Sequence, residues 1–404
     1  MNAVGVIVEY NPFHNGHAFH LEEARKAAKA EIVIAVMSGN FLQRGEPAIV
    51  SKWKRTEMAL KAGVDIVFEL PYAFATQQAD TFASGAVSIL EAAGCRSLCF
   101  GSEAGNMDSF QRTLLFLKNN NEHYQNQVKF HLQKGNSYPK ASSLAFDDLS
   151  PDEGMIDLSK PNNILGYQYL MAAQKQKASL EVLTVTRKDA AYHDEHFASE
   201  SIASATSIRK ALFSHNGQIS DVQHYMPETT YNSLLKYKEE FGLFHEWEQY
   251  FSYLKFRLLH TTPNELKNIY EVEEGLENRM LLAVQGAFSF RQFMEKLKTK
   301  RYTWTRLQRA CVHILTNTTK DELSLKDEKA SYLRLLGMTS NGREYLNQNK
   351  SRLALPLISR VSSQQNRQLM LDIRASRVYA MGAAGKGQAQ LLEKEFKQPP
   401  IMIK

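Results

Sequence analysis

An alternation of apolar runs and helix-forming segments is the feature that most restricts the fold. Residues 3–9 form a continuous apolar run, which is typical of a strand buried on both faces of a parallel sheet. Residues 18–30 are rich in Ala, Leu, Glu and Lys, which are strong helix formers. The alternation continues with strands at 31–37, 64–69 and 97–100 and helices at 51–62 and 81–93. It predicts an α/β domain with an open, mostly parallel sheet and ligands beyond the carboxyl ends of its strands.

The later part of the chain has a different pattern. Residues 106–178 have helical character, and residues 180–186 form one more predicted strand. After about residue 215 the strand signals fade and helical spacing dominates, in segments 229–240, 246–259, 263–283, 287–299 and 303–316. With 404 residues, the chain is long enough for two cores. We therefore expect a Rossmann-like domain over 1–212 and a mostly α-helical domain over 213–404.

The composition limits where the protein works. It has 43% hydrophobic and 23% charged residues, as soluble globular proteins do, and its apolar runs are far shorter than the roughly 20 residues that span a bilayer. The three cysteines, Cys95, Cys99 and Cys311, form no CxxC pair, so a disulfide framework and a thiolate zinc site are both disfavoured. These features predict a cytoplasmic protein that neither spans nor binds a membrane.

The charge is unevenly distributed. Residues 291–404 carry a net charge of +13 and residues 1–290 a net charge of −7, which together give the overall +6. A basic block favours a polyanionic partner such as RNA, because each neutralised phosphate releases counterions. The alternative is a lysine-rich surface that only improves solubility. Within the block, cations and aromatic residues are interleaved over 296–309, a pattern suited to phosphates and unpaired bases.

The first chemical motif is His14-Asn-Gly-His17, which follows the first predicted strand and opens the first predicted helix. A helix amino terminus offers unpaired N–H groups and a partial positive charge, so it binds anions. Gly16 allows a phosphate to come close, and the two imidazoles add hydrogen-bond donors. Such a site can stabilise the transition state at the α-phosphate of ATP. Two histidines near a glycine also occur by chance; the flanking strand and helix argue against that alternative.

The second motif is Ser204-Ala-Thr-Ser207-Ile-Arg209-Lys210. Ser204 or Thr206 is a natural cap for a helix that begins near residue 206, so this segment presents a second helix amino terminus. Arg209 and Lys210 lie one turn into that helix and can neutralise the β- and γ-phosphates. The alternative is a capped surface helix with basic residues, which the presence of the first motif disfavours.

Four sequence strings together resemble one family. They are Val6–His17, Ser38–Ala48, Phe68–Pro71 and Ala203–Arg209. The histidine and serine motifs resemble those of the HIGH-superfamily nucleotidyltransferases, and the longer strings resemble the bacterial tRNA(Met) cytidine acetate ligases over the whole chain. The resemblance implies a nucleotidyltransferase fold and a reaction in which acetate and ATP form acetyl-adenylate. The wobble cytidine of elongator tRNA(Met) would then attack it, giving N4-acetylcytidine.

The resemblance also implies which residues act. His14, His17 and Arg209 would be catalytic. Contacts to ATP would come from Ile7, Val8, Glu9, Tyr10, Asn11, Pro12, Phe13, His14, Asn15, Gly16, His17, His20, Gly101, Asn162, Arg187, Lys188 and Ser207. At position 20 a basic residue would help, and a neutral imidazole contributes less charge. Mg²⁺ is expected with the ATP phosphates, held by them and by water rather than by a protein cage.

Other polar segments have weaker signals. The loop Gln43-Arg44-Gly45-Glu46, followed by Lys52 and Arg55, is either a substrate or tRNA contact or plain loop structure. His193 and His196 have the spacing of a metal pair but no third ligand in view, so no metal site is predicted. Asp65 and Glu69 flank a buried strand and either orient the site or form caps and ion pairs.

Two other classes of function remain open at this point. A coenzyme adenylyltransferase would join AMP to a small phosphorylated substrate without RNA. Such enzymes are usually compact single domains, and the long, basic-ended helical region argues against that class. A non-catalytic RNA-binding protein on a degenerate nucleotide fold is disfavoured because both phosphate motifs are intact.

Overall fold

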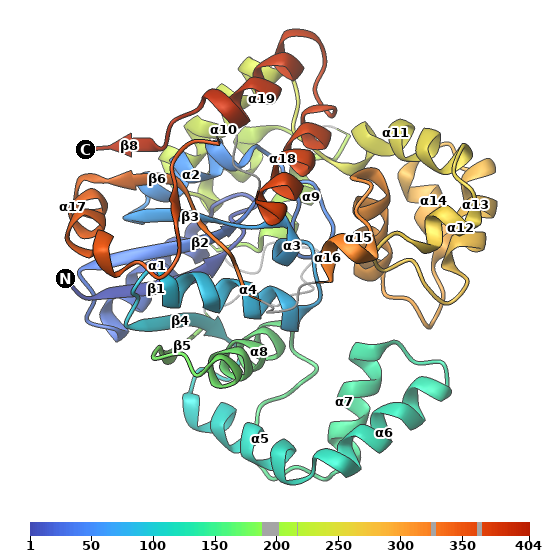
Figure 1. Ribbon diagram of the computed structural model, residues 1–404, viewed down its shortest axis with the longest axis horizontal. Coiled ribbons are helices and arrows are strands. Elements are labelled where there is room, and N and C mark those ends of the chain that lie inside the picture. The colour runs from blue at the N-terminus through green and yellow to red at the C-terminus, as the bar shows by residue number, and fades with distance from the viewer. Residues whose placement is uncertain (188–201, 216, 325–328, 362–365) are drawn as a thin grey trace.

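The computed structural model describes residues 1–187, 202–215, 217–324, 329–361 and 366–404. Its centre is one eight-stranded sheet with the order β5-β4-β1-β2-β3-β6-β7, in which β8 also pairs with β6 (Figure 1). The strands are β1 (Ala3–Val8), β2 (Ile32–Ser38), β3 (Ile66–Leu70), β4 (Ser97–Ser102), β5 (Glu181–Thr186), β6 (Leu333–Thr339), β7 (Leu357–Ile358) and β8 (Ile401–Ile403). Strands β1 to β5 run parallel, which confirms the predicted α/β sheet, and β6 is antiparallel to β3.

Helices cover both faces of the sheet, as continuous apolar strands require. The even-numbered side chains of β1 share a core with α1 (Asn15–Ala27), α2 (Lys52–Lys61), α9 (Ala205–Leu212) and α10 (Glu228–Phe241). On the other face, Ala3 and Ile7 pack with a core that includes α3 (Tyr72–Ala75), α4 (Ala79–Ala92) and α8 (Pro161–Gln176). The helices predicted at 18–30, 51–62 and 81–93 are therefore confirmed, with ends shifted by up to three residues.

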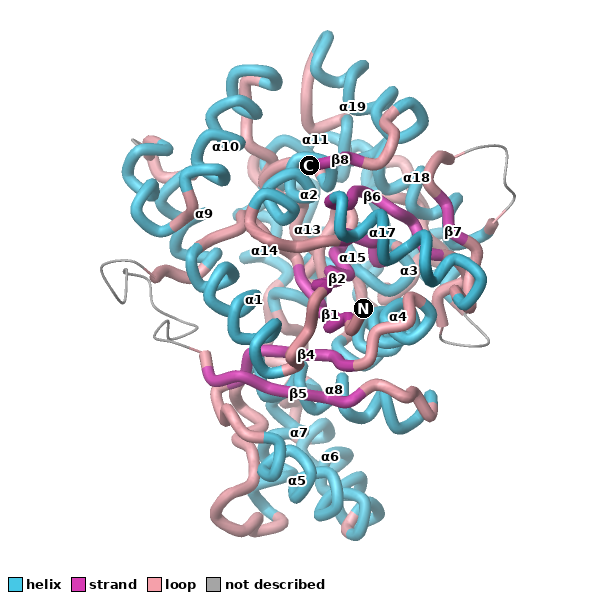
Figure 2. Tube along the Cα trace, turned by 90° about the vertical axis from the view of Figure 1, so that its left-hand side faces the viewer, coloured by secondary structure: helices cyan, strands magenta, loops and turns pink. Residues whose placement is uncertain are grey.

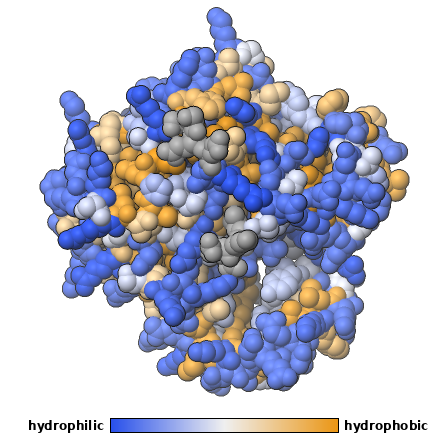
Figure 3. Space-filling view, in the orientation of Figure 1, coloured by the Kyte–Doolittle hydropathy of each residue, from blue (hydrophilic) through white to orange (hydrophobic). Residues whose placement is uncertain are grey.

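Two groups of helices project from the sheet (Figure 1), and the first of them extends below β4 and β5 in Figure 2. The first consists of α5 (Met107–Asn119), α6 (Asn121–Gln133) and α7 (Tyr138–Asp148). The second consists of α11 (Trp247–Leu259), α12 (Pro263–Lys267), α13 (Leu276–Gln285), α14 (Phe290–Leu297), α15 (Trp304–Leu315) and α16 (Lys320–Leu323). The 3₁₀ helix η1 (Ile219–Tyr225) lies between α9 and α10. In Figure 3 a hollow separates the two groups. The predicted single helix over 263–283 is in fact two, with a break between α12 and α13.

The carboxyl-terminal segment returns to the sheet. After β6 come α17 (Ser340–Asn349), the 3₁₀ helix η2 (Lys350–Arg352), β7, α18 (Arg367–Ala380), α19 (Gly385–Lys397) and β8. Residues 213–404 are mostly helical, as expected, but they also contain the strands β6, β7 and β8, which were not predicted from the sequence. Strand β6 is largely buried, and Arg334 and Gly337 interrupt its apolar residues, so its sequence has neither a continuous apolar run nor an alternating pattern. The proposed division between residues 212 and 213 stays a prediction.

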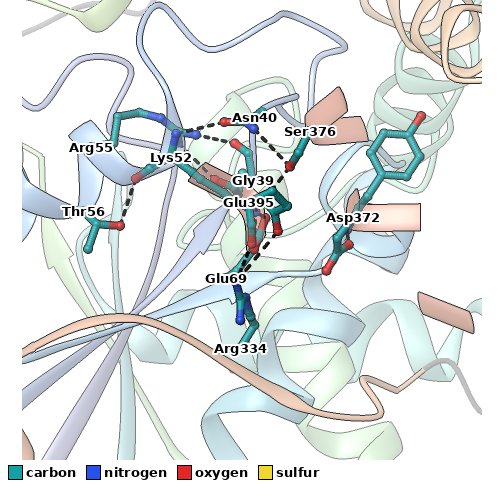
Figure 4. A network of polar contacts seen from close by, with 12 residues as sticks. Gly39, Asn40, Lys52, Arg55, Thr56, Glu69, Arg334, Asp372, Ser376 and Glu395 are labelled. Atoms are coloured by element: carbon teal, nitrogen blue, oxygen red, sulfur yellow. Dashed lines mark hydrogen bonds and ion pairs between the residues drawn. The ribbon is translucent and has the colours of Figure 1, made fainter. Parts of the chain in front are cut away.

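A buried ionic cluster fixes this returning segment to the first strands (Figure 4). The ammonium of Lys52 lies 2.7 Å from Glu69 on β3 and 2.8 Å from Glu395 on α19. The guanidinium of Arg334 lies 3.9 Å from the same Glu395 carboxylate. All four side chains are at most 3% exposed. Lys52 and Glu69, which were candidates for the functional loop or for orienting the site, are thus structural.

Strand β3 is also held by Asp65, the residue directly before it. Asp65 accepts a hydrogen bond from the Val33 amide at 2.9 Å and forms an ion pair with Arg25 at 2.8 Å. Asp65 therefore ties β3 to β2 and α1. In the described part of the chain, no helix is long and apolar enough to cross a bilayer.

Candidate active site

A pocket opens where β1 and β4 separate. The two strands pair only at Val4–Ser97 and Gly5–Leu98; beyond these positions β1 continues beside β2, and β4 continues beside β5. This is the point at which the strand order reverses, where α/β proteins bind their ligands. The pocket lies between the carboxyl ends of β1 and β4 and is lined by both phosphate motifs.

His14 and His17 occupy the amino terminus of α1. The Nδ1 atom of His14 accepts a hydrogen bond from the Gly16 amide at 3.1 Å, and the Nδ1 atom of His17 accepts one from the His14 amide at 3.3 Å. These two bonds form a capping box, and the rings stack with centroids 3.7 Å apart. The motif therefore fixes both imidazoles on the pocket wall, which the sequence alone did not specify.

Both imidazoles are neutral near pH 7. Burial lowers the pKa of His14 to about 3, with Arg187 and Arg209 adding to the effect. Burial also lowers the pKa of His17 well below its usual value, and His14 and Arg187 contribute. Because each Nδ1 atom is an acceptor, the single proton of each neutral ring is on Nε2. The pair thus offers uncharged N–H donors to a ligand, in keeping with stabilisation of charge on a phosphate.

The second motif forms the amino terminus of α9. Ser204 is the N-cap, and its hydroxyl accepts a hydrogen bond from the Ser207 amide at 3.0 Å. Arg209 lies one turn further and reaches back across the pocket. Its guanidinium donates to the carbonyl of Asn11 at 2.9 Å and pairs with Glu46 at 2.8 Å. Two helix amino termini and one arginine therefore converge on the same space, as an anionic ligand requires.

The β4–β5 side of the pocket carries the other predicted ATP residues. Gly101 lies in β4, and a Cβ atom there would be 3.2 Å from Arg187 and 3.6 Å from His20. A larger side chain would therefore narrow the pocket. Asn162 lies in the first turn of α8, and its side-chain amide donates a hydrogen bond to the Glu103 carboxylate at 2.7 Å. Burial lowers the pKa of His20 to about 4, so it adds no charge near pH 7.

Several polar atoms on the pocket wall lack a hydrogen-bond partner within the described ranges. They are the Tyr10 hydroxyl, the Asn11 side-chain nitrogen and the Nε2 atom of His20. All three residues line the pocket. Burying such groups without partners is costly, so their presence here favours a polar ligand that completes their bonds.

The structure brings together most of the residues expected to contact ATP. Those that line the pocket are Ile7, Val8, Glu9, Tyr10, Asn11, His14, Gly16, His17, His20, Gly101, Asn162 and Arg187. Four others do not: Pro12, Phe13, Asn15 and Ser207. The Phe13 ring packs on Tyr10, and the Asn15 amide donates to the His224 carbonyl at 2.9 Å. Ser207 lies in the first turn of α9, where its amide donates to the Ser204 hydroxyl. Lys188 lies outside the described residues.

Sequence reasoning missed the apolar wall of the pocket. Phe82 on α4, Phe100 on β4, and Leu165 and Tyr169 on α8 all line it. Nothing in their spacing distinguishes them from ordinary core residues, because their role depends on how α4 and α8 pack over the crevice. The loop with Gln43, Arg44 and Glu46, one of whose two interpretations was a substrate contact, lines the same pocket. By contrast, Arg55 is fully buried and donates to backbone carbonyls, so it is structural.

Metal ligands do not gather in the described ranges, where no group of three or more His, Cys, Asp or Glu side chains is arranged to hold an ion. His193 and His196 lie outside those ranges. The three cysteines are free and buried.

Comparison with known proteins shows the family to which the chain belongs. The family model described as HIGH Nucleotidyl Transferase matches residues 1–395. A tRNA(Met) cytidine acetate ligase of Bacillus cereus (strain AH187) is 49% identical over 94% of this chain and 98% of its own length. One of Geobacillus sp. (strain WCH70) is 48% identical, with both chains covered completely. The chain belongs to the tRNA(Met) cytidine acetate ligase family.

Solved structures agree with this family. Thermotoga maritima TmcAL in its apo form superposes with a TM-score of 0.90 at 32% identity, over all of both chains. The same protein bound with alpha-thio ATP superposes with a TM-score of 0.89, again over all of both chains. The fold of this family member is therefore that of a protein solved with an ATP analogue.

Proposed function

We propose that this protein activates acetate with ATP and transfers the acetyl group to N4 of the wobble cytidine of elongator tRNA(Met). The observation that supports this most strongly is the pocket between β1 and β4. There the His14–His17 pair and the start of α9 converge, in a chain 48–49% identical over 94% or more of its length to tRNA(Met) cytidine acetate ligases. The enzyme is thus an ATP-dependent ligase with an acyl-adenylate intermediate.

The first step forms acetyl-adenylate. A carboxylate oxygen of acetate attacks the α-phosphorus, the bond to pyrophosphate breaks, and pyrophosphate leaves with the electron pair. His14 and His17 would donate hydrogen bonds from Nε2 to the α-phosphate as charge develops on it. Arg209 and the N–H groups at the start of α9 would bind the β- and γ-phosphates. Mg²⁺ would neutralise the phosphates, bound by them and by water.

The second step uses the adenylate. The N4 amine of cytidine attacks the acetyl carbon, AMP leaves, and the amine loses a proton. The cytidine must be unpaired to reach the pocket, as it is in an anticodon loop. We propose that residues 213–404 supply the RNA contacts, and that the protein acts in the cytoplasm.

The segment 296–309 supports this RNA surface only in part. Lys298, Lys300 and Arg301 are exposed between α14 and α15. Tyr302 is buried, and its hydroxyl donates to the Glu274 carbonyl, so its ring cannot stack on a base. Arg309 is buried in an ion pair with Glu271 at 2.9 Å. The proposed phosphate contacts are therefore Lys298, Lys300 and Arg301, which lie between α14 and α15.

Mass analysis of nucleosides tests the proposal. Purified protein is incubated with ATP, isotopically labelled acetate and elongator tRNA(Met), and the tRNA is digested. We expect labelled N4-acetylcytidine together with AMP and pyrophosphate, without any need for acetyl-coenzyme A. Acetylation that required acetyl-coenzyme A and ignored ATP would refute it. Transfer of AMP to a small phosphorylated compound would instead identify a coenzyme adenylyltransferase.

A further inference from the structure

The pocket extends beyond the phosphate motifs into an apolar recess. We define the acyl recess as Ile7, Phe82, Phe100, Leu165 and Tyr169, all of which line the pocket. The three rings belong to one core cluster and are at most 5% exposed. Phe100 meets Tyr169 edge to face, with centroids 5.7 Å apart. Helix α8 is pressed onto β4, since a Cβ atom at Gly166 would be 2.1 Å from the Phe100 ring. The wall is therefore closely packed.

The acyl recess and the phosphate motifs lie on opposite faces of the sheet. Ile7 packs with the core on the α4 and α8 side, whereas its neighbours Val6 and Val8 pack with the core on the α1 and α9 side. The separation of β1 from β4 joins the two faces through the crevice. A small molecule in the recess would therefore approach the α-phosphate from the side opposite His14 and His17.

Charged side chains line the same pocket as the acyl recess, among them Glu9, Arg44 and Arg209. The Glu9 carboxylate, at the end of β1, accepts a hydrogen bond from the Gln43 amide at 2.8 Å. The guanidinium of Arg44 is close enough to interact electrostatically with Glu9, Glu46 and Arg209. Arg44 lines the same pocket as the recess, so it brings a positive charge to a cavity with an apolar side, the combination that a short carboxylic acid needs.

Glu9 is the group that would oppose an anion here. Burial raises the pKa of Glu9, while Arg44 and Arg209 lower it to a smaller extent. A carboxyl group with a raised pKa takes up a proton more readily and then repels a bound carboxylate less.

We propose that the acyl recess together with Arg44 forms the binding site for the short aliphatic carboxylic acid, and that Phe82 limits its chain length. This inference rests on the proposed function, because it assumes that an acid attacks ATP. The carboxylate would face Arg44 and the α-phosphate, and the methyl group would face Ile7, Phe82 and Tyr169. Phe82 lies near the start of α4, and its ring, which is 3% exposed, lines the pocket. A longer acyl chain would have to displace it.

The test measures acid-dependent ATP–pyrophosphate exchange without tRNA, using acetate, propionate and butyrate in turn. In Phe82→Ala the ratio of kcat/KM for propionate to that for acetate should rise about tenfold or more, since one methylene in a pocket is worth about that factor. Phe82→Leu is a smaller change that should raise the same ratio to a lesser extent. It provides the test if Phe82→Ala folds poorly. Phe146→Ala is the matched control, because Phe146 belongs to the same core and is 4% exposed but does not line the pocket.

The role of Arg44 is tested by comparing the KM for acetate with the affinity for ATP. In Arg44→Gln the KM for acetate should rise about tenfold or more, the scale of a charge-assisted hydrogen bond, while the ATP affinity changes less than about threefold. Arg44→Lys should recover part of the acetate affinity, because it restores the charge without the fork geometry.

The outcomes separate this inference from the proposed function. If acetate does not stimulate exchange in the wild-type protein, the proposed function fails and this inference fails with it. If the wild type responds to acetate but the acid preference of both Phe82 variants equals that of Phe146→Ala, the size-limiting role of Phe82 is overturned. An unchanged acetate KM in Arg44→Gln would likewise overturn the assignment of Arg44.

Discussion

The indole nitrogen of Trp247 donates a hydrogen bond to the carbonyl oxygen of Gly45 at 2.8 Å. Gly45 has a φ of +74°, and a Cβ atom there would be 2.3 Å from the Arg309 amide nitrogen on α15. The loop that carries Arg44 and Glu46 into the pocket is therefore held between α11 and α15. Through this contact the projecting helices position part of the candidate active site.

Trp247→Phe tests this positioning. In the wild-type protein the rings of Trp247 and Phe290 stack with centroids 4.2 Å apart. The substitution keeps a ring at this position but removes the hydrogen-bond donor to the Gly45 carbonyl. We expect kcat/KM for acetate in pyrophosphate exchange to fall about three- to tenfold, the scale of one hydrogen bond. Trp304→Phe is the control, because Trp304 is 37% exposed on α15. Equal effects of the two variants would argue against a link through the loop.

The next prediction separates His17 from Arg209. His17→Ala should lower kcat about a hundredfold or more, because a donor to charge formed in the transition state is lost, while ATP affinity changes less. Arg209→Ala should weaken ATP binding as well, because the phosphates it would bind are charged before reaction. Exchange rates and equilibrium ATP binding distinguish the two effects. Near-normal turnover in His17→Ala would assign that histidine to helix capping alone.

The proposed RNA surface is tested by replacing the cations between α14 and α15. Replacing Lys298, Lys300 and Arg301 with alanine should weaken tRNA binding and reduce its salt dependence by up to about one unit of slope for each lost phosphate contact. Acetate-dependent exchange without tRNA should be retained. Arg306→Ala is the comparison, since Arg306 lies over the Tyr302 ring and 3.7 Å from Glu274. Unchanged affinity and slope in the triple variant would place the RNA surface elsewhere.

Buried neutral histidines make the stability depend on pH. His245 is 1% exposed between the hydroxyls of Tyr237 and Tyr250, and burial lowers its pKa to about 3. The unfolded chain, with a histidine pKa of about 6.5, binds more protons between these values, so stability falls as pH falls. Each such histidine contributes up to about 1.4 kcal/mol per pH unit below pH 6. Denaturant unfolding at several pH values should show a shallower slope in His245→Gln, and an identical slope would contradict this.

Lys52 provides a test of the ionic cluster. Lys52→Met removes the cation that pairs with both Glu69 and Glu395, leaves Arg334 as the remaining cation of the cluster, and should reduce the free energy of unfolding by about 3–5 kcal/mol. Lys26→Met is the matched control, because the pair of Lys26 with Glu22 is more than 60% exposed on both sides and should contribute less than about 1 kcal/mol. Denaturant titration measures both. If the two variants lost similar amounts of unfolding free energy, burial would not determine how much an ion pair contributes to stability.

The sequence predicted what depends on local order. The apolar run 3–9 and the motif that begins at His14 predicted a strand, an anion-binding helix terminus and the next helix, because periodicity and capping act over a few residues. The same holds for Ser204 as N-cap of α9. The long strings around these motifs also identified the family before any fold was known.

Tertiary structure alone decided what depends on contacts between distant segments. Strand β6 was missed because it is buried on both faces and contains Arg334, whose charge is compensated by Glu395 some sixty residues later. Phe82 and Tyr169 became pocket walls only when α4 and α8 packed over the crevice between β1 and β4. Tyr302 and Arg309 looked like RNA contacts but are buried, because exposure depends on the partner surface and not on residue type. Local sequence sets periodicity and caps, whereas burial is a property of the whole packed chain.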